Sequence, residues 1–448
     1  MNRKINLLEG PILKKIILLS APLMATAFIQ TTYNLVDMAW LGRLGEGAVA
    51  AVGAGGIYSW LAASIATIAR VGTNVYTSQY YGSNNKVKLN NVIKNGLLLV
   101  IILSLIYTVI VQIFANGLIG FYNLREEVTS MGVVYLRFVA LGYIVQFINP
   151  VLSAIYNSTG QSVKPFLNNS VGLIINLVLD PLLIFGPGIF PEMGILGAAL
   201  ATVIAQVVVT LLFIIDIIKN KNEIYDAMKD GILKFVELIK IFKMGFPAGI
   251  QSALQASIAL VLNRFMSEYG SMPLAVYTIG TNIESISWVS AEGLQGGIVA
   301  FVGQNYGARK KDRLKEIINK SLRLVFIIGL ITTSILIIFR YQLYQVFMPG
   351  QREAILVGAN LMIIAGISQS FMCMEIGCSG VFQGLGLTKI PSMISIIFNL
   401  VRIPLSLILM PYYGYYGIWI AVSISCILKG TISFAIVNFK NIILITKG

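Results

Sequence analysis

The chain has 448 residues, of which 56% are hydrophobic and only 12% charged, and its mean hydropathy is +0.81. A soluble globular domain carries about 25% charged residues, so the composition excludes that class and predicts a protein that lives in a lipid bilayer. No histidine is present, which excludes histidine metal sites and histidine proton switches. The formal net charge of +14 would suggest nucleic-acid binding in a soluble chain.

Apolar runs long enough to cross the hydrocarbon recur from one end of the chain to the other. They are continuous rather than alternating with period two, which excludes a β-barrel. The pattern therefore predicts an all-α membrane protein with twelve transmembrane helices. In chain order these are expected at residues 16–40, 50–80, 92–117, 130–157, 165–187, 194–218, 240–267, 273–304, 317–345, 354–384, 391–411 and 414–438.

Positive charge is unevenly distributed between the loops that join these spans. The loops on the side of the N-terminus hold most of the lysines and arginines, at positions 86, 88, 164, 219–243, 309–315 and 389. Cytoplasmic loops carry such an excess. We therefore expect a multi-pass protein of the inner (plasma) membrane with both termini in the cytoplasm, and no nucleic-acid partner.

The two halves of the chain repeat one another. Pro22 and Pro247 open the first and seventh spans, and further identical residues recur at the same offset of 225 positions (247 − 22). These pairs are Gln30 with Gln255, Gly55 with Gly280, Gly72 with Gly297, and Gln79, Tyr81 and Gly82 with Gln304, Tyr306 and Gly307. A shared bias toward leucine and isoleucine would not match proline, glycine and glutamine, so the repeat indicates internal duplication.

The duplication predicts a domain organisation. Residues 1–218 and 240–448 are expected to form two six-helix lobes, related by a pseudo-two-fold axis along the membrane normal because each half has an even number of spans. Residues 219–239 are expected to be a cytoplasmic linker, partly amphipathic and lying on the membrane surface.

Ionisable side chains within the spans are the strongest functional candidates, because a charge in lipid costs several kcal/mol unless it has a partner or a wet cavity. Asp37 ends the first span and Asp180 lies in the fifth, with Asn176 one helical turn away on the same face. Thr202, in the sixth span, should reach a similar depth. Together they predict an oxygen-rich site for a proton or for Na⁺. The alternatives are an interfacial Asp37, an Asp-Pro corner at Asp180, and ordinary interhelical hydrogen bonds for Asn176 and Thr202.

The second half has its own acidic residues within spans: Glu284 and Glu292 in the eighth span and Glu375 in the tenth. They are candidates for a cavity wall that attracts a cationic substrate. Alternatively, they form ion pairs with basic residues in apolar segments. Those basic residues are Arg70, Arg264, Arg402 and Lys429.

Aromatic and methionine side chains near the span ends could stack on flat cations. Tyr33, Met38 and Trp288 are candidates for such a substrate cavity, and Gln255 of the seventh span is a polar one. The alternative for the aromatic residues is the belt that marks a membrane interface.

Signals of other classes are missing from the sequence. It has no phosphate-binding loop of the type G-x-x-x-x-G-K-[ST]. We therefore expect a transporter rather than an enzyme, without a cofactor and driven by an ion gradient.

Several segments resemble the multidrug and toxic compound extrusion (MATE) family, and the resemblance covers nearly the whole chain. The segments are Pro22 with Val36-Asp37-x-x-x-x-Gly42, Ser78-Gln79-Tyr80-Tyr81-Gly82 with Val302-Gly303-Gln304-Asn305-Tyr306-Gly307-Ala308, Asn176-Leu-Val-Leu-Asp180-Pro181, and Gly194-x-x-Gly197-Ala-Ala-x-Ala-Thr202. The chain looks closest to the prokaryotic DinF-like branch, since its seventh span lacks the glutamate of the branch that binds Na⁺ in the C-terminal lobe.

The resemblance implies a multidrug efflux antiporter that exports cationic amphipathic compounds in exchange for H⁺ or Na⁺. It also implies that Asp37, Asn176, Asp180 and Thr202 line the cation site, and we expect a monomer in contact with membrane lipids. One alternative is a flippase for lipid-linked oligosaccharides or polysaccharides from the same superfamily. A channel or receptor is another, although the two-lobe duplication argues against it.

Overall fold

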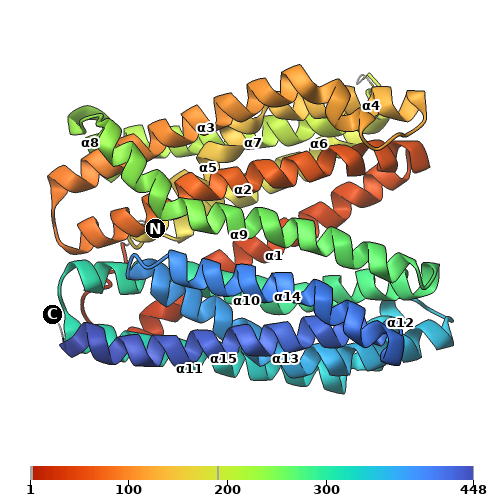
Figure 1. Ribbon diagram of the computed structural model, residues 1–448. Helices are drawn as coiled ribbons and strands as arrows, with labels where there is room; N and C mark the ends of the chain where they lie inside the picture. Colours follow the sequence, from red (N-terminus) through yellow and green to blue (C-terminus); the bar gives the residue numbers. More distant parts are fainter. Residues whose placement is uncertain (1–3, 189–190, 447–448) are drawn as a thin grey trace. The chain divides into compact units, whose positions relative to one another are not determined.

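The computed structural model describes the backbone of residues 4–188 and 191–446, and the side chains in these ranges except those at 33–35, 37–39, 46 and 440–446. Within this part the chain forms fifteen α-helices and no strand (Figure 1). The helices are α1 (Ile12–Gly42), α2 (Glu46–Gly82), α3 (Lys86–Gly120), α4 (Glu126–Leu141), α5 (Tyr143–Ser158), α6 (Val163–Phe185), α7 (Ile195–Asn220), α8 (Glu223–Asp230), α9 (Phe235–Ser267), α10 (Ser271–Gly307), α11 (Lys311–Ile338), α12 (Arg340–Phe347), α13 (Arg352–Gly384), α14 (Lys389–Tyr413) and α15 (Tyr416–Thr446).

The all-α membrane fold predicted from composition is confirmed. Among the described helices, ten are long and apolar enough to cross a membrane, and the pair α4 and α5, bent by 46°, makes an eleventh. Helix α10 has 37 residues, about 55 Å at 1.5 Å per residue, but it is too polar to meet the same criterion. Apolarity alone therefore supports ten or eleven spans rather than twelve.

Contacts divide the chain into two compact units. Unit 1 contains Ala25–Gly249 and the residues up to Ile5, and unit 2 contains Asn6–Met24 and Ile250–Gly448. Helices α1 and α9 therefore each contribute their first half to one unit and their second half to the other. The lobe boundaries expected from the repeat, at residues 218 and 240, differ from this division.

Glycines explain why the first halves of α1 and α9 are placed in this way. A Cβ at Gly72 of α2 would lie only 2.2 Å from the backbone oxygen of Ile241 in α9. At the matching position of the repeat, a Cβ at Gly297 of α10 would lie 2.1 Å from Oγ of Ser20 in α1. Small residues let helix backbones approach closely in membranes, so α9 packs on α2 in unit 1 just as α1 packs on α10 in unit 2.

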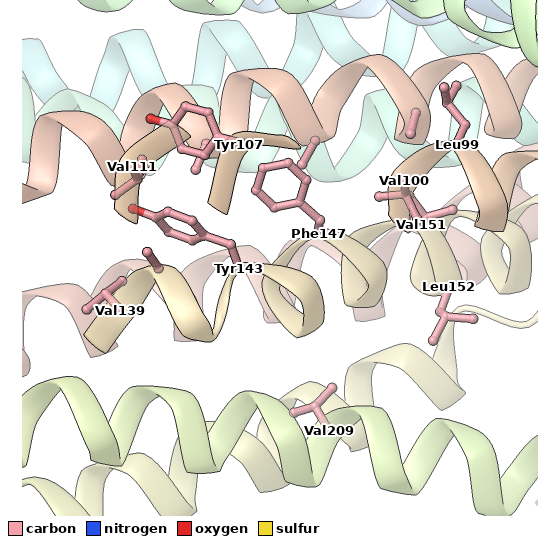
Figure 2. Close-up of a cluster of buried hydrophobic side chains, with 14 of the residues drawn as sticks. Leu99, Val100, Tyr107, Val111, Val139, Tyr143, Phe147, Val151, Leu152 and Val209 are labelled. Carbon is pink, nitrogen blue, oxygen red and sulfur yellow. The ribbon is translucent and has the colours of Figure 1, made fainter. Parts of the chain in front are cut away.

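Aromatic rings fill part of the core of unit 1. Figure 2 shows Tyr107 of α3 beside Tyr143 and Phe147 of α5. The ring centroids of Tyr107 and Tyr143 are 5.4 Å apart. The Tyr107 hydroxyl donates a hydrogen bond of 2.7 Å to the backbone carbonyl of Tyr58, which satisfies a polar group that would be costly to bury alone.

The segment between α7 and α9 is attached to α3, and the short helix α8 lies against α3 (Figure 1). Asn95 of α3 donates to the carbonyl of Ile232 at 2.8 Å and accepts from the backbone N–H of Lys234 at 3.0 Å. Asn91, one turn earlier, accepts from the N–H of Ile232 at 2.8 Å. Two asparagines thus supply the hydrogen bonds that this stretch of backbone lacks outside a helix.

Helix α13 is the centre of unit 2, in contact with α10, α11, α12, α14 and α15. Its neighbours approach it closely at glycines. A Cβ at Gly430 of α15 would lie 2.2 Å from the backbone oxygen of Phe371, and one at Gly329 of α11 would lie 2.7 Å from Cα of Ser370. Helices α11 and α15 therefore flank the same stretch of α13.

Candidate functional site

Asn176 and Asp180 form a buried polar pair in α6. Their residues are 2% and 1% exposed, and the Asn176 amide donates a hydrogen bond of 3.1 Å to Oδ1 of Asp180. Residues four apart share a helix face, so the spacing noted in the sequence brings the two groups together. Pro181 follows inside the helix. Because proline has no N–H, the carbonyl of Leu177 loses its usual helical donor, which adds an oxygen acceptor close by.

The other predicted members of this site are only partly described. Asp37 lies in helical backbone of α1, but its side chain is outside the described residues, as are those of Tyr33 and Met38. Thr202 is partly buried in α7, which packs along α6. The structure therefore shows the Asn176–Asp180 pair, while the convergence of Asp37 and Thr202 on it, and a Na⁺ ion bound by these residues, stay predictions.

The second copy of the same motif carries the opposite charge. The segment Asn399-Leu-Val-Arg402-Ile403-Pro404 of α14 corresponds to Asn176-Leu-Val-Leu-Asp180-Pro181 of α6. Isoleucine replaces the aspartate, and a guanidinium stands one position earlier. Arg402 donates from Nε to Oγ of Ser425 at 3.0 Å and from Nη2 to Sγ of Cys426 at 3.3 Å, both on α15. The helix in unit 2 therefore provides its own cation where the helix in unit 1 provides a carboxylate.

Glu284 of α10 belongs to the same polar region of unit 2. Glu284 is partly buried, and Arg402 and Gln369 are near enough to act on its carboxylate electrostatically, although the described residues form no ion pair with it within 4 Å. Within the apolar interior a guanidinium stabilises a neighbouring carboxylate. Both the pairing alternative and the cavity-wall role of Glu284 stay predictions.

Glu375 of α13 is held by groups from two other helices. Its Oε2 lies 3.6 Å from Nζ of Lys429 on α15, and its Oε1 accepts a hydrogen bond of 2.5 Å from Ser395 on α14. All three residues are buried. The structure therefore places Glu375 in an internal ion pair rather than on an open surface, and it identifies Ser395, which the sequence did not single out.

The remaining substrate candidates are on the surface. Glu292 and Gln255 are exposed, and Trp288 is 38% exposed. A cavity of about 490 Å³ lies elsewhere in unit 2, between α11, α13 and α15, and none of these three residues lines it. Contact of these side chains with a substrate stays a prediction.

Comparison with known proteins agrees with the repeat and with the fold. The MatE family model matches residues 22–182 and again 247–408, so its two matches begin 225 residues apart, the offset found in the sequence. The chain is 25% identical over 424 residues to a probable multidrug resistance protein, NorM, of Thermotoga maritima, covering 94% of this chain and 90% of that protein.

Two further similarities extend over most of the chain. It is 28% identical over 407 residues to a probable multidrug resistance protein, YoeA, of Bacillus subtilis, covering 89% and 88% of the two chains. A solved MOP superfamily transporter from Pyrococcus furiosus superposes with a TM-score of 0.89 at 23% identity, covering 97% of each chain. The two family matches span more than half of the 448 residues, and the chain therefore belongs to the MatE family of membrane transporters.

Proposed function

We propose that the chain is a secondary active antiporter that exports cationic amphipathic compounds in exchange for H⁺ or Na⁺. Relatives are named multidrug resistance proteins in T. maritima and B. subtilis and a multidrug export protein in Staphylococcus saprophyticus. The observation that carries the proposal is the carboxylate of Asp180, which is buried in an apolar span and hydrogen-bonded to Asn176.

The buried position of this carboxylate makes its ion-free and ion-bound states differ in energy. An ionised aspartate in a span costs several kcal/mol unless a cation or donor compensates it. A proton or Na⁺ removes that cost, so occupancy changes how favourably α6 packs against α7. A ligand shifts a conformational equilibrium only through such a difference between states. Ion binding and drug binding that favour opposite states are then coupled, which is the requirement for exchange.

Unit 2 is less suited to the ion. Its interior acid Glu375 is paired with Lys429, and the charge of Arg402 acts on Glu284. A resident cation on the protein competes with an ion from solution, because a like charge at the same place disfavours binding. This contrast supports ion coupling in unit 1.

The decisive experiment measures dye efflux from proteoliposomes under a Na⁺ gradient alone and under a pH gradient alone. Asp180→Asn and Asp37→Asn keep the side-chain shape and remove the charge, so we expect either variant to abolish gradient-driven efflux while expression remains intact. Glu316→Gln, in an exposed helix pair with Lys320, is the matched control and should retain efflux. Normal efflux by both aspartate variants would contradict the proposed role of these residues in ion coupling. An absence of dye movement by the wild type under either gradient would contradict the proposal that the chain is an antiporter.

A further inference from the structure

The cavity of about 490 Å³ in unit 2 is a groove with a polar end and an apolar floor. Helices α11 and α15 flank α13 and line its two sides. The polar end is formed by Asn319, Arg323 and Asn438, and the apolar part by Leu322, Phe371 and Phe434. The volume is within the range of about 300–1,000 Å³ that small-molecule sites occupy.

Chain direction explains why the polar groups meet. Helix α11 begins at Lys311, at one end of the groove. The chain reverses direction three times between α11 and α15, before α13, α14 and α15, so α15 runs antiparallel to α11. Asn319 lies near the start of α11, and Asn438 lies eight residues after Gly430, about 12 Å along α15. Both asparagines therefore lie at the end of the groove nearer Lys311, and the floor at Phe371 lies deeper in the apolar part of the helices.

Arg323 is the charged group of the groove. It is exposed, and the described part of the chain supplies it with neither an ion pair nor a side-chain hydrogen bond. Two other basic residues of α11 are engaged: Lys320 pairs with Glu316, and Arg313 donates to the carbonyl of Gly10. No charged residue follows Arg323 before Arg340. Arg323 therefore marks the border between the polar interface and the hydrocarbon, where arginine meets lipid phosphates.

We propose that this groove binds an anionic phospholipid from the leaflet on the side of Lys311, with the lipid phosphate at Arg323 and one acyl chain over Leu322, Phe371 and Phe434. Arginine recognises phosphate through paired N–H donors, and its positive charge favours a lipid with net negative charge over one whose phosphate is balanced by a choline ammonium. The same positive charge repels the cationic compounds proposed as substrates, so the groove is a lipid site separate from the transport path.

The test is native mass spectrometry of the full-length protein, released from detergent with equal amounts of phosphatidylglycerol and phosphatidylcholine of the same chain length. We expect selective retention of phosphatidylglycerol. Arg323→Gln should weaken that binding about tenfold or more, the effect of losing a charge-assisted hydrogen bond, whereas Arg323→Lys should weaken it less. Lys315→Gln removes a charge from an exposed position of α11 outside the groove and should leave binding unchanged.

A second variant addresses the apolar part. Thr431 is exposed and lines the groove, so Thr431→Trp should fill it without disturbing the core and should displace the lipid. Equal retention of the two lipids, or no effect of Arg323→Gln and Thr431→Trp, would overturn the proposal. A dimer that dissociates in Thr431→Trp would do the same, because it would show that a second copy of the chain occupies the groove.

Discussion

Asp180 and Arg402 show how one duplicated motif has acquired opposite charges. Both lie between an asparagine and a proline that the two halves share, so the helices that carry them are built alike. The carboxylate has an amide donor on its own helix, whereas the guanidinium is held by Ser425 and Cys426. The same asparagine–proline frame therefore carries a carboxylate in unit 1 and, one position earlier, a guanidinium in unit 2.

The ion pair of Glu375 and Lys429 leads to a stability prediction. Lys429→Met leaves a buried carboxylate without its cation, which should lower the free energy of unfolding by about 3 kcal/mol or more. The double variant Glu375→Gln with Lys429→Met removes both charges and should recover most of the loss. Cys373, Cys378 and Cys426 are free and buried, so the temperature at which a thiol-reactive fluorophore labels the purified protein measures the effect. Equal destabilisation of the single and double variants would show that the two side chains stabilise the fold through packing rather than through their charges.

At the level of residues, the sequence predicted the contacts that depend on helical spacing. Asn176 and Asp180 are four residues apart, and helix geometry alone places them together. The partner of Glu375 could not be predicted in this way, because four basic residues in apolar segments were available. Tertiary packing selects Lys429 and adds Ser395.

At the level of elements, the segment between α7 and α9 shows that an amphipathic pattern predicts a surface location without identifying the helix that the segment contacts. Its composition indicated a linker on the membrane surface, but not which helix would hold it. Asn91 and Asn95 of α3 bind its backbone, and buried Ile224 and Ala227 of α8 add apolar contact. The presence of Asn91 and Asn95 among the apolar residues of α3 was the feature of the sequence that could have indicated this contact.

This attachment can be tested by limited proteolysis. Asn95→Ala removes both hydrogen bonds to the stretch from Ile232 to Lys234, at a cost of roughly 1 kcal/mol for each. The stretch should open more often, and trypsin should cleave after Lys229 and Lys234 faster than in the wild type. Asn116→Ala changes an exposed asparagine on the same helix and serves as the control. Equal cleavage rates in the two variants would count against the proposed role of Asn95.

The positions of the helices were largely predictable from apolar runs, and the exceptions have physical causes. The run at 130–157 is two helices, since the chain bends by 46° at Gly142. The run at 317–345 is likewise divided at Phe339 into α11 and α12. The run at 273–304 was expected as an apolar span, but α10, which carries Glu284 and Glu292, is not among the described helices that are apolar enough to cross a membrane.

At the level of the whole molecule, the distribution of lysine and arginine predicts the orientation in the membrane. Glu127 is exposed at the start of α4, Lys315 is exposed near the start of α11, and the native cysteines are buried. We expect Glu127→Cys to react with a membrane-impermeant thiol reagent in intact cells, and Lys315→Cys to react only after the membrane is opened. Mass tagging of the protein measures both reactions. The reverse pattern would invert the topology and place both termini outside.

The division of α1 and α9 between the units bears on how such a chain arose. In an ancestor that comprised a single half, the glycine surface around Gly72 would have lacked α9, which covers it in unit 1 and begins the second half. A second copy could have covered it, by an exchange of the first halves of the two opening helices, as in domain swapping. Gene fusion would then have made permanent a partnership that previously depended on two molecules meeting.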